Sequence, residues 1–349
     1  MNSMTLLNNT CDKKDNLGKS TGKIIRLLLS FTALLLFGYF IYRVGLNNLR
    51  QQINKADLFM IFLAVGSYCV SNAVRALRFR CLLLPKQVLF IPIFHLTNLY
   101  NFITAMFPMG TGEFSYPILL KQKFGEEFGK GLHAVIITRL FDILIILPCC
   151  IITCLIFFGS VPILIPLFMF LFFLIIIFCY LINRRYSQKI RSFLETVVKK
   201  TNSRIINKLL NILITMYSEY EKLFTGYLPL KVLIYSVGQW FFVFLFFWFI
   251  LQAVGLEISL LQSVYIGTSM TLFSFLPVNA LGGIGFRDAA LTWLLTMIGF
   301  SGKEALSSSI LIRVISLATL AGLPVLTLLL TRIQCPSEIN STRSNQKKQ

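Results

Sequence analysis

The chain has 349 residues and a formal net charge of +19, yet 56% of its residues are hydrophobic and only 13% are charged. Soluble domains are about 45–50% apolar and about 25% charged, so this composition excludes an ordinary soluble enzyme. The apolar residues gather in runs of roughly 20, which is the length that crosses a bilayer as a helix. The basic residues lie between these runs, which favours positive-inside topology over nucleic-acid binding. We therefore predict an all-α polytopic integral membrane protein.

Six strong apolar spans are expected along the chain, separated by weaker apolar pieces. The strong spans cover residues 24–42, 57–73, 134–158, 162–182, 232–254 and 306–330. The weaker pieces cover residues 88–109, 114–120, 261–276 and 286–300. A basic tail, residues 1–23, precedes the first span, which no small-residue cleavage site follows, so we expect an uncleaved span. The transmembrane domain is expected over residues 24–332, with a second basic tail over residues 333–349.

The connector over residues 183–231 orients these spans, because it carries ten Lys and Arg against three Glu. Under the positive-inside rule it is cytoplasmic, and both termini are then cytoplasmic too, in a plasma membrane or a bacterial inner membrane. Its apolar residues recur at helical spacing. That pattern fits a basic amphipathic helix on the anionic inner leaflet, and it fits a solvated helical loop equally well.

The weaker apolar pieces are predicted to form two re-entrant or broken hairpins, because each pair must return to the side from which it entered. The fold is then about six full spans plus two hairpins in an inverted-repeat-like arrangement. Each hairpin tip has a proline, then glycines, then an acidic residue. The first tip contains Gly112 and Glu113, and the second contains Gly283, Gly285, Arg287 and Asp288. Matched Gly/Pro breaks in two halves indicate a transporter's central site, with ordinary kinked helices as the alternative.

Charged residues within the apolar spans are the other candidates for a site, because an intramembrane charge usually faces a partner or a cavity. Arg139 and Asp142 lie at i, i+3 and are expected to pair, either to pin helices or to contact substrate. Arg313 has no local partner, and the acidic residues at the hairpin tips, Glu113 and Asp288, are its plausible companions. Asn101 is expected to line the same cavity.

Arg75, Arg78 and Arg80 close the second span. Snorkelling at the membrane edge is the ordinary interpretation of such residues, and a surface for anionic lipid headgroups is the functional one. The sequence has no Ser-His-Asp order, no metal-ligand cluster and no ATP-binding motif. We therefore expect no enzymatic activity, no catalytic residues, no cofactor and no metal.

The motifs resemble one family. Gly112-Glu113, the Arg139…Asp142 pair, the stretch over residues 276–290 and Arg313 resemble the transmembrane, flippase-like domain of lysylphosphatidylglycerol synthases. The resemblance covers roughly residues 24–330, and we expect the chain to lack the soluble aminoacyl-transfer domain of the full-length synthases. Thr138 stands where the family tends to have Glu. The resemblance implies the lipid-translocating half of such a protein without the synthetic half.

Three functions follow as expectations. The first is a flippase that moves an anionic or aminoacylated phospholipid, or a lipid-linked precursor, between leaflets, driven by the lipid gradient or an ion. The second is a membrane accessory subunit that positions a lipid-modifying enzyme or glycosyltransferase. The third is a small-solute secondary transporter. The residues expected to bind the substrate are Asn101, Gly112, Glu113, Arg139, Asp142, Gly283, Gly285, Arg287, Asp288 and Arg313.

Overall fold

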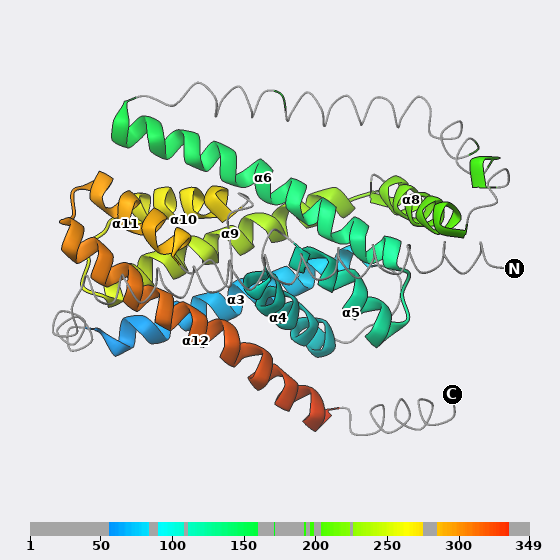
Figure 1. Ribbon diagram of the computed structural model, residues 1–349, viewed down its shortest axis with the longest axis horizontal. Helices are drawn as coiled ribbons and strands as arrows, with labels where there is room; N and C mark the ends of the chain where they lie inside the picture. The colour runs from blue at the N-terminus through cyan, green and yellow to red at the C-terminus, as the bar shows by residue number, and fades with distance from the viewer. Residues whose placement is uncertain are drawn as a thin grey trace, which may run out of the picture.

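The computed structural model describes residues 56–83, 90–107, 111–159, 204–223, 226–274 and 285–334, with a few residues at 171, 192 and 196–198. This part of the chain is all-helical (Figure 1). The elements are α3 (Leu58–Leu82), α4 (Phe90–Met106), the 3-10 helix η1 (Thr111–Phe114), α5 (Ser115–Phe124), α6 (Phe128–Phe158), α8 (Arg204–Leu223), α9 (Leu228–Ala253), α10 (Leu260–Ser274), α11 (Phe286–Ile298) and α12 (Gly302–Gln334). The predicted span 24–42 and, apart from residue 171, the predicted span 162–182 lie outside the described residues, as does Gly283.

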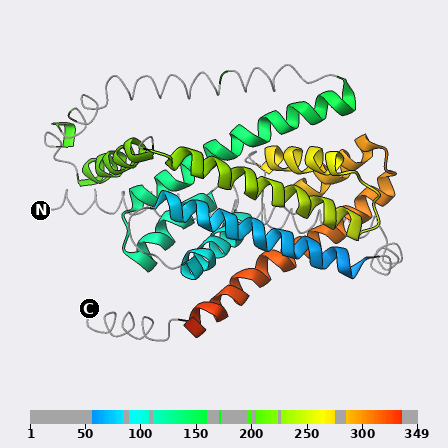
Figure 2. The same ribbon diagram turned by 180° about the vertical axis from the view of Figure 1, so that it is seen from behind.

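Four of these helices, α3, α6, α9 and α12, are long and apolar enough to cross a membrane. α3 and α9 pack side by side, and all four run broadly along the long axis of the bundle (Figures 1 and 2). Their large apolar side chains point outward, for example Phe59, Phe62, Ile152, Ile156, Ile234, Phe241, Val325 and Leu329. Water would penalise such a surface, whereas lipid would not, so the chain is a multi-pass integral membrane protein.

The short helices correspond to the weaker apolar pieces of the sequence. α4, η1 and α5 lie towards one end of the bundle, and α10 and α11 lie towards the other (Figure 1). α4 packs against α3 and α12, whereas α10 packs against α6 and α9, and α11 packs against α12. The two groups of short helices therefore occupy opposite halves of the bundle. Six full crossings and two re-entrant hairpins stay a prediction.

Two glycines give the backbone close to the hairpin tips its shape. A Cβ on Gly112 would come within 2.4 Å of the Thr104 Cα, so only glycine lets η1 lie directly against α4. Gly285 has a φ of 87°, a conformation that glycine adopts without steric penalty, and α11 begins at the next residue. Both glycines lie within three residues of an acidic side chain of the candidate site, Glu113 or Asp288.

Candidate functional site

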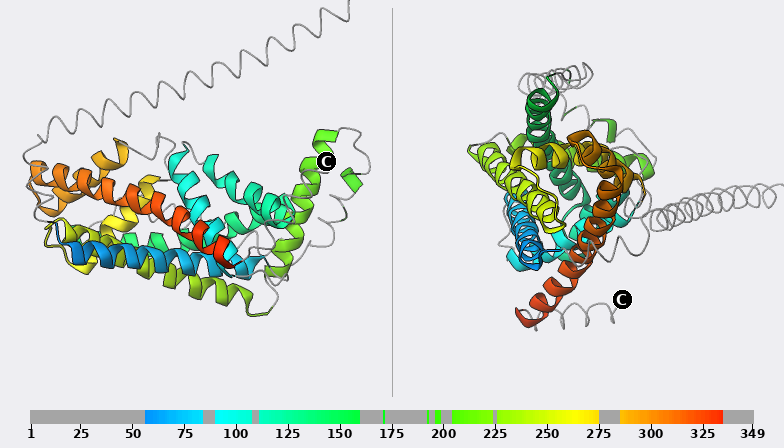
Figure 3. Two further views of the ribbon diagram at one scale, coloured as in Figure 1. Left: turned by 90° about the horizontal axis from the view of Figure 1, so that it is seen from below. Right: turned by 90° about the vertical axis from the view of Figure 1, so that its left-hand side faces the viewer.

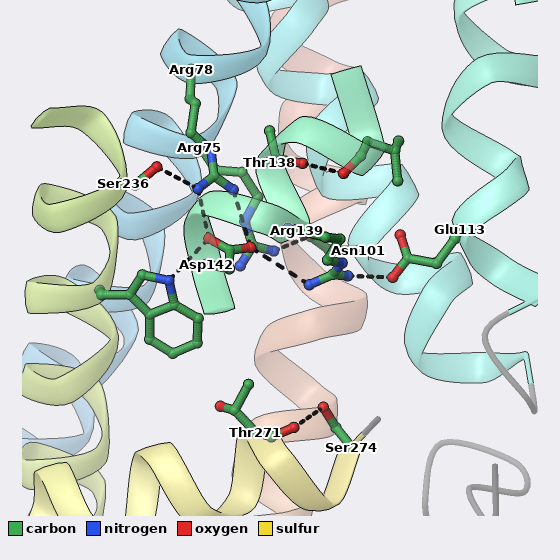
Figure 4. A network of polar contacts seen from close by, with 12 residues as sticks. Arg75, Arg78, Asn101, Glu113, Thr138, Arg139, Asp142, Ser236, Thr271 and Ser274 are labelled. Atoms are coloured by element: carbon green, nitrogen blue, oxygen red, sulfur yellow. Dashed lines mark hydrogen bonds and ion pairs between the residues drawn. The ribbon is translucent and has the colours of Figure 1, made fainter. Parts of the chain in front are cut away.

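A charged pair inside the bundle joins α3 to α6 (Figure 4). Arg78 Nη1 donates to Asp142 Oδ1 at 2.6 Å, and Arg78 Nη2 donates to Asp142 Oδ2 at 3.3 Å. Their side chains are only 1% and 2% exposed. α9 completes the contacts, because Trp240 Nε1 donates to Asp142 Oδ1 at 3.0 Å and the Ser236 hydroxyl accepts from Arg78 Nη1 at 2.9 Å. Three spanning helices therefore meet at one buried ion pair.

The buried position of Arg78 fits neither sequence-based interpretation of Arg75, Arg78 and Arg80, which were snorkelling at the membrane edge and a surface for lipid headgroups. Arg78 is buried against α6 and α9, so it is not part of that surface. α3 continues beyond the predicted end at residue 73 and runs to Leu82. The predicted span ended just before Arg75, the first charged residue after the apolar run. The helix itself continues past this point, because a buried partner neutralises the charge of Arg78. Arg80 is exposed, as a lipid-headgroup contact requires.

A second ion pair lies beside the first and is partly open. Arg139 and Glu113 form a salt bridge between α6 and η1, and the Tyr100 hydroxyl of α4 donates to the Glu113 carboxylate. The Arg139 and Glu113 side chains are 32% and 27% exposed. Arg139 Nη1 also lies 3.7 Å from Asp142 Oδ2, which confirms the predicted i, i+3 pair. The network thus has a buried end at Asp142 and an accessible end at Glu113.

Arg75 reaches the same network from α3, one turn before Arg78. Its Nη1 donates to Asn101 Oδ1 at 2.6 Å, and Asn101 Nδ2 in turn donates to Asn72 Oδ1 at 2.9 Å. The direct partner of this guanidinium among the described residues is therefore a neutral amide. Arg75, Arg78 and Arg139 all lie around the single carboxylate of Asp142, which leaves positive charge in excess there (Figure 4).

A second buried pair lies at the start of α11. Arg313 Nε of α12 donates to Asp288 Oδ1 at 2.7 Å, with side chains 9% and 1% exposed. The other carboxylate oxygen accepts from the Gly285 backbone N–H at 3.0 Å, so Asp288 also caps its own helix. Of the two companions that the sequence offered for Arg313, the structure selects Asp288. A bond of 2.7 Å between the Thr292 and Ser309 hydroxyls joins the same two helices one turn further on.

Arg287 differs from the other arginines in this region. Its side chain is partly buried, and its Nε is inaccessible to water and has no hydrogen-bond partner in the described part of the chain. The Tyr68 side chain of α3 lies within electrostatic reach of both Arg75 and Arg287. Tyr68 thus has one arginine from each group of charges in its electrostatic surroundings.

Sequence reasoning missed several residues of this site: Tyr68, Tyr100, Ser236, Trp240 and the pairing role of Arg78. The sequence did hold a signal for the role of Arg78, because an aspartate within the membrane, Asp142, needs a positively charged partner. The end of the second predicted span offers three arginines as candidates. Tyr100, Ser236 and Trp240 carry no such signal, since a neutral hydroxyl or indole group does not require a charged partner. Only their contacts in the folded bundle identify them: Tyr100 bonds to Glu113, Ser236 to Arg78 and Trp240 to Asp142.

Comparison with known proteins agrees with this architecture. A family model described as the lysylphosphatidylglycerol synthase TM region matches residues 23–323, which is most of the chain. No curated protein matches the chain, and no solved structure matches it. The family match covers both ion-pair clusters and all four candidate membrane spans except the end of α12. The chain belongs to the family of the lysylphosphatidylglycerol synthase transmembrane region.

Proposed function

We propose that this protein moves a phospholipid between the two leaflets and binds the anionic phosphate of its headgroup at the partly open arginines. The excess of positive charge inside an apolar bundle is the observation that carries the proposal. Among the described residues, five arginines lie near three carboxylates; they are Arg75, Arg78, Arg139, Arg287 and Arg313 against Glu113, Asp142 and Asp288. A charge at mid-bilayer costs at least about 2.5–3.5 kcal/mol, so an unneutralised one calls for an anionic ligand.

The arginines divide into two roles according to their burial. Arg78 and Arg313 are at most 9% exposed and each pairs with its own carboxylate, so they hold helices together. Arg75, Arg139 and Arg287 are less buried, and neither Arg75 nor Arg287 has a carboxylate within ion-pair distance among the described residues. A guanidinium group binds phosphate through two parallel N–H donors, so these three suit a phosphate.

Glu113 supplies a way to release the headgroup. Its carboxylate forms an ion pair with Arg139 in the structure and also accepts a hydrogen bond from the Tyr100 hydroxyl. A phosphate that binds Arg139 competes with this carboxylate, and Glu113 rebinds Arg139 as the lipid leaves. The exchange of one anion for another keeps the guanidinium neutralised throughout, which avoids exposing an unpaired charge inside the membrane. The function is transport, and no covalent chemistry is assigned to these residues.

The test is a transport assay in proteoliposomes with lipids that carry a fluorophore on an acyl chain, read out by a membrane-impermeant quencher. Protein should make inner-leaflet phosphatidylglycerol accessible, and a ceramide-based glycolipid without phosphate should stay protected. Charged hydrogen bonds contribute about 1.5–3 kcal/mol, so Arg75→Gln with Arg287→Gln should slow transfer at least about tenfold. Arg80→Gln is the matched control, because Arg80 is exposed on the same helix as Arg75.

Three results would contradict the proposal. If the double variant transfers lipid as fast as the unsubstituted protein, Arg75 and Arg287 do not bind the phosphate. Absence of transfer with every lipid, from protein shown to be folded by its thermal unfolding, would favour the accessory-subunit function instead. Saturable uptake of a water-soluble solute, in the absence of lipid transfer, would favour a secondary transporter.

A further inference from the structure

α8 stands apart from the spanning helices in direction and in surface. It runs across the long axis of the bundle, at the end where α6 begins (Figure 3). It is strongly amphipathic, and three large apolar side chains, Ile206, Leu209 and Leu213, are 47–58% exposed on one face. Lys208 and Asn211 are exposed on the opposite face. A helix in water would not keep such an apolar stripe uncovered.

Contacts with α6 hold α8 in this orientation. A Cβ on Gly129 would come within 2.8 Å of the Thr215 Cβ and 3.0 Å of the Ile212 carbonyl oxygen, so the two backbones approach closely at that glycine. The Thr215 hydroxyl donates to Glu127 Oε2 at 2.9 Å, just before α6 begins. These contacts use the side of α8 away from Ile206 and Leu213, so packing on α6 leaves the apolar stripe free.

We propose that α8 is a membrane-surface helix, whose stripe of Ile206, Leu209 and Leu213 inserts into the lipid leaflet at the end of the bundle where α6 begins. Amphipathic helices that lie in the membrane plane bury their apolar face about 5–10 Å into the boundary between headgroups and acyl chains. The attachment at Gly129 then links the leaflet surface to α6, the helix that carries Arg139 and Asp142. This surface is separate from the proposed headgroup site.

Two observations identify lipid as the occupant of the stripe. First, α9 begins five residues after α8 ends, and its exposed Leu230 and Ile234 belong to the apolar surface of a spanning helix, so α8 is joined by a short connection to a surface that lipid would cover. Second, the connector that contains α8, residues 183–231, carries ten Lys and Arg against three Glu. This excess of positive charge complements an anionic leaflet.

The experiment uses the full chain in vesicles of phosphatidylcholine and phosphatidylglycerol, with a spin label at Leu213→Cys or, as the matched control, at Asn211→Cys. Natural cysteines that react with the label are first replaced. Accessibility to oxygen, which partitions into lipid, is compared with accessibility to a water-soluble nickel chelate. We expect Leu213 to prefer oxygen, at a depth of about 5–10 Å below the headgroups, and Asn211 to prefer nickel. The labels replace exposed side chains and therefore leave the fold intact.

Two outcomes of this experiment would overturn the proposal. If nickel reaches Leu213 as well as it reaches Asn211, the stripe faces water. If neither reagent reaches Leu213, a protein, either a partner or a second copy, covers the stripe. The charge argument is tested separately by energy transfer from a fluorophore at Asn211→Cys to headgroup-labelled lipids. We expect at least about twofold more transfer to phosphatidylglycerol than to phosphatidylcholine, reduced by Lys208→Glu; equal transfer would refute an anionic preference.

Discussion

The buried pair of Arg78 and Asp142 makes the most direct prediction. Asp142→Asn keeps the shape of the side chain but removes the negative charge that Arg78 contacts at 2.6 Å. Arg78 is 1% exposed, so bulk water does not reach its guanidinium group. Removing one partner of a buried ion pair costs about 3–5 kcal/mol because the other charge stays buried and uncompensated. For a chain of this size that is a fall of roughly 6–10 °C in the unfolding midpoint, at about 2 °C per kcal/mol.

Thermal unfolding in detergent measures this loss, with tryptophan fluorescence as the readout, because Trp240 donates to the same carboxylate. The double variant Arg78→Met with Asp142→Asn removes both charges, so its loss should be smaller than the sum of the two single losses by about 2–3 kcal/mol. Arg80→Met, on the exposed side of α3, should change stability by less than about 0.5 kcal/mol. A neutral Asp142→Asn, or strict additivity in the double variant, would refute the reasoning.

Two further substitutions test the glycine contact and the buried pair of Asp288 and Arg313. Gly112→Ala brings a Cβ within 2.4 Å of the Thr104 Cα, so it should displace η1 from α4 and slow lipid transfer. The control Gly66→Ala, at a position with open space around it, should leave the transfer rate unchanged. Equal transfer rates in the two variants would contradict the close approach of η1 to α4. Asp288→Asn keeps a side-chain oxygen that can cap α11 but removes the charge that Arg313 contacts at 2.7 Å. The midpoint of thermal unfolding should therefore fall, as it should for Asp142→Asn. An unchanged midpoint would contradict a stabilising ion pair at Asp288.

The spanning helices were largely predictable because bilayer length and apolarity are properties of consecutive residues. The predicted span 232–254 corresponds to α9 (Leu228–Ala253), and 134–158 lies within α6 (Phe128–Phe158). Errors occurred where a helix carries charge near its end. α3 was predicted to stop at residue 73 but runs to Leu82, because Arg78 finds its counter-ion on another helix.

The site was predictable where partners are close in sequence. Arg139 and Asp142 were paired from their i, i+3 spacing, and Asp288 was one of two partners offered for Arg313. The stronger partners come from distant segments: Asp142 binds Arg78, 64 positions earlier, and Trp240, 98 positions later. No local periodicity encodes such contacts, because they depend on which faces of three helices meet.

The sequence alone determined that this chain is an all-α, multi-pass membrane protein with intramembrane charges and a basic amphipathic connector. Each of these properties comes from composition and from periodicity within a single helix. The tertiary structure decided which charges neutralise each other and which remain partly open. Arg78 and Arg80 lie two positions apart on the same helix, yet one is buried in an ion pair and the other is exposed. The difference arises because the Arg78 side chain reaches partners on α6 and α9, whereas Arg80 stays exposed.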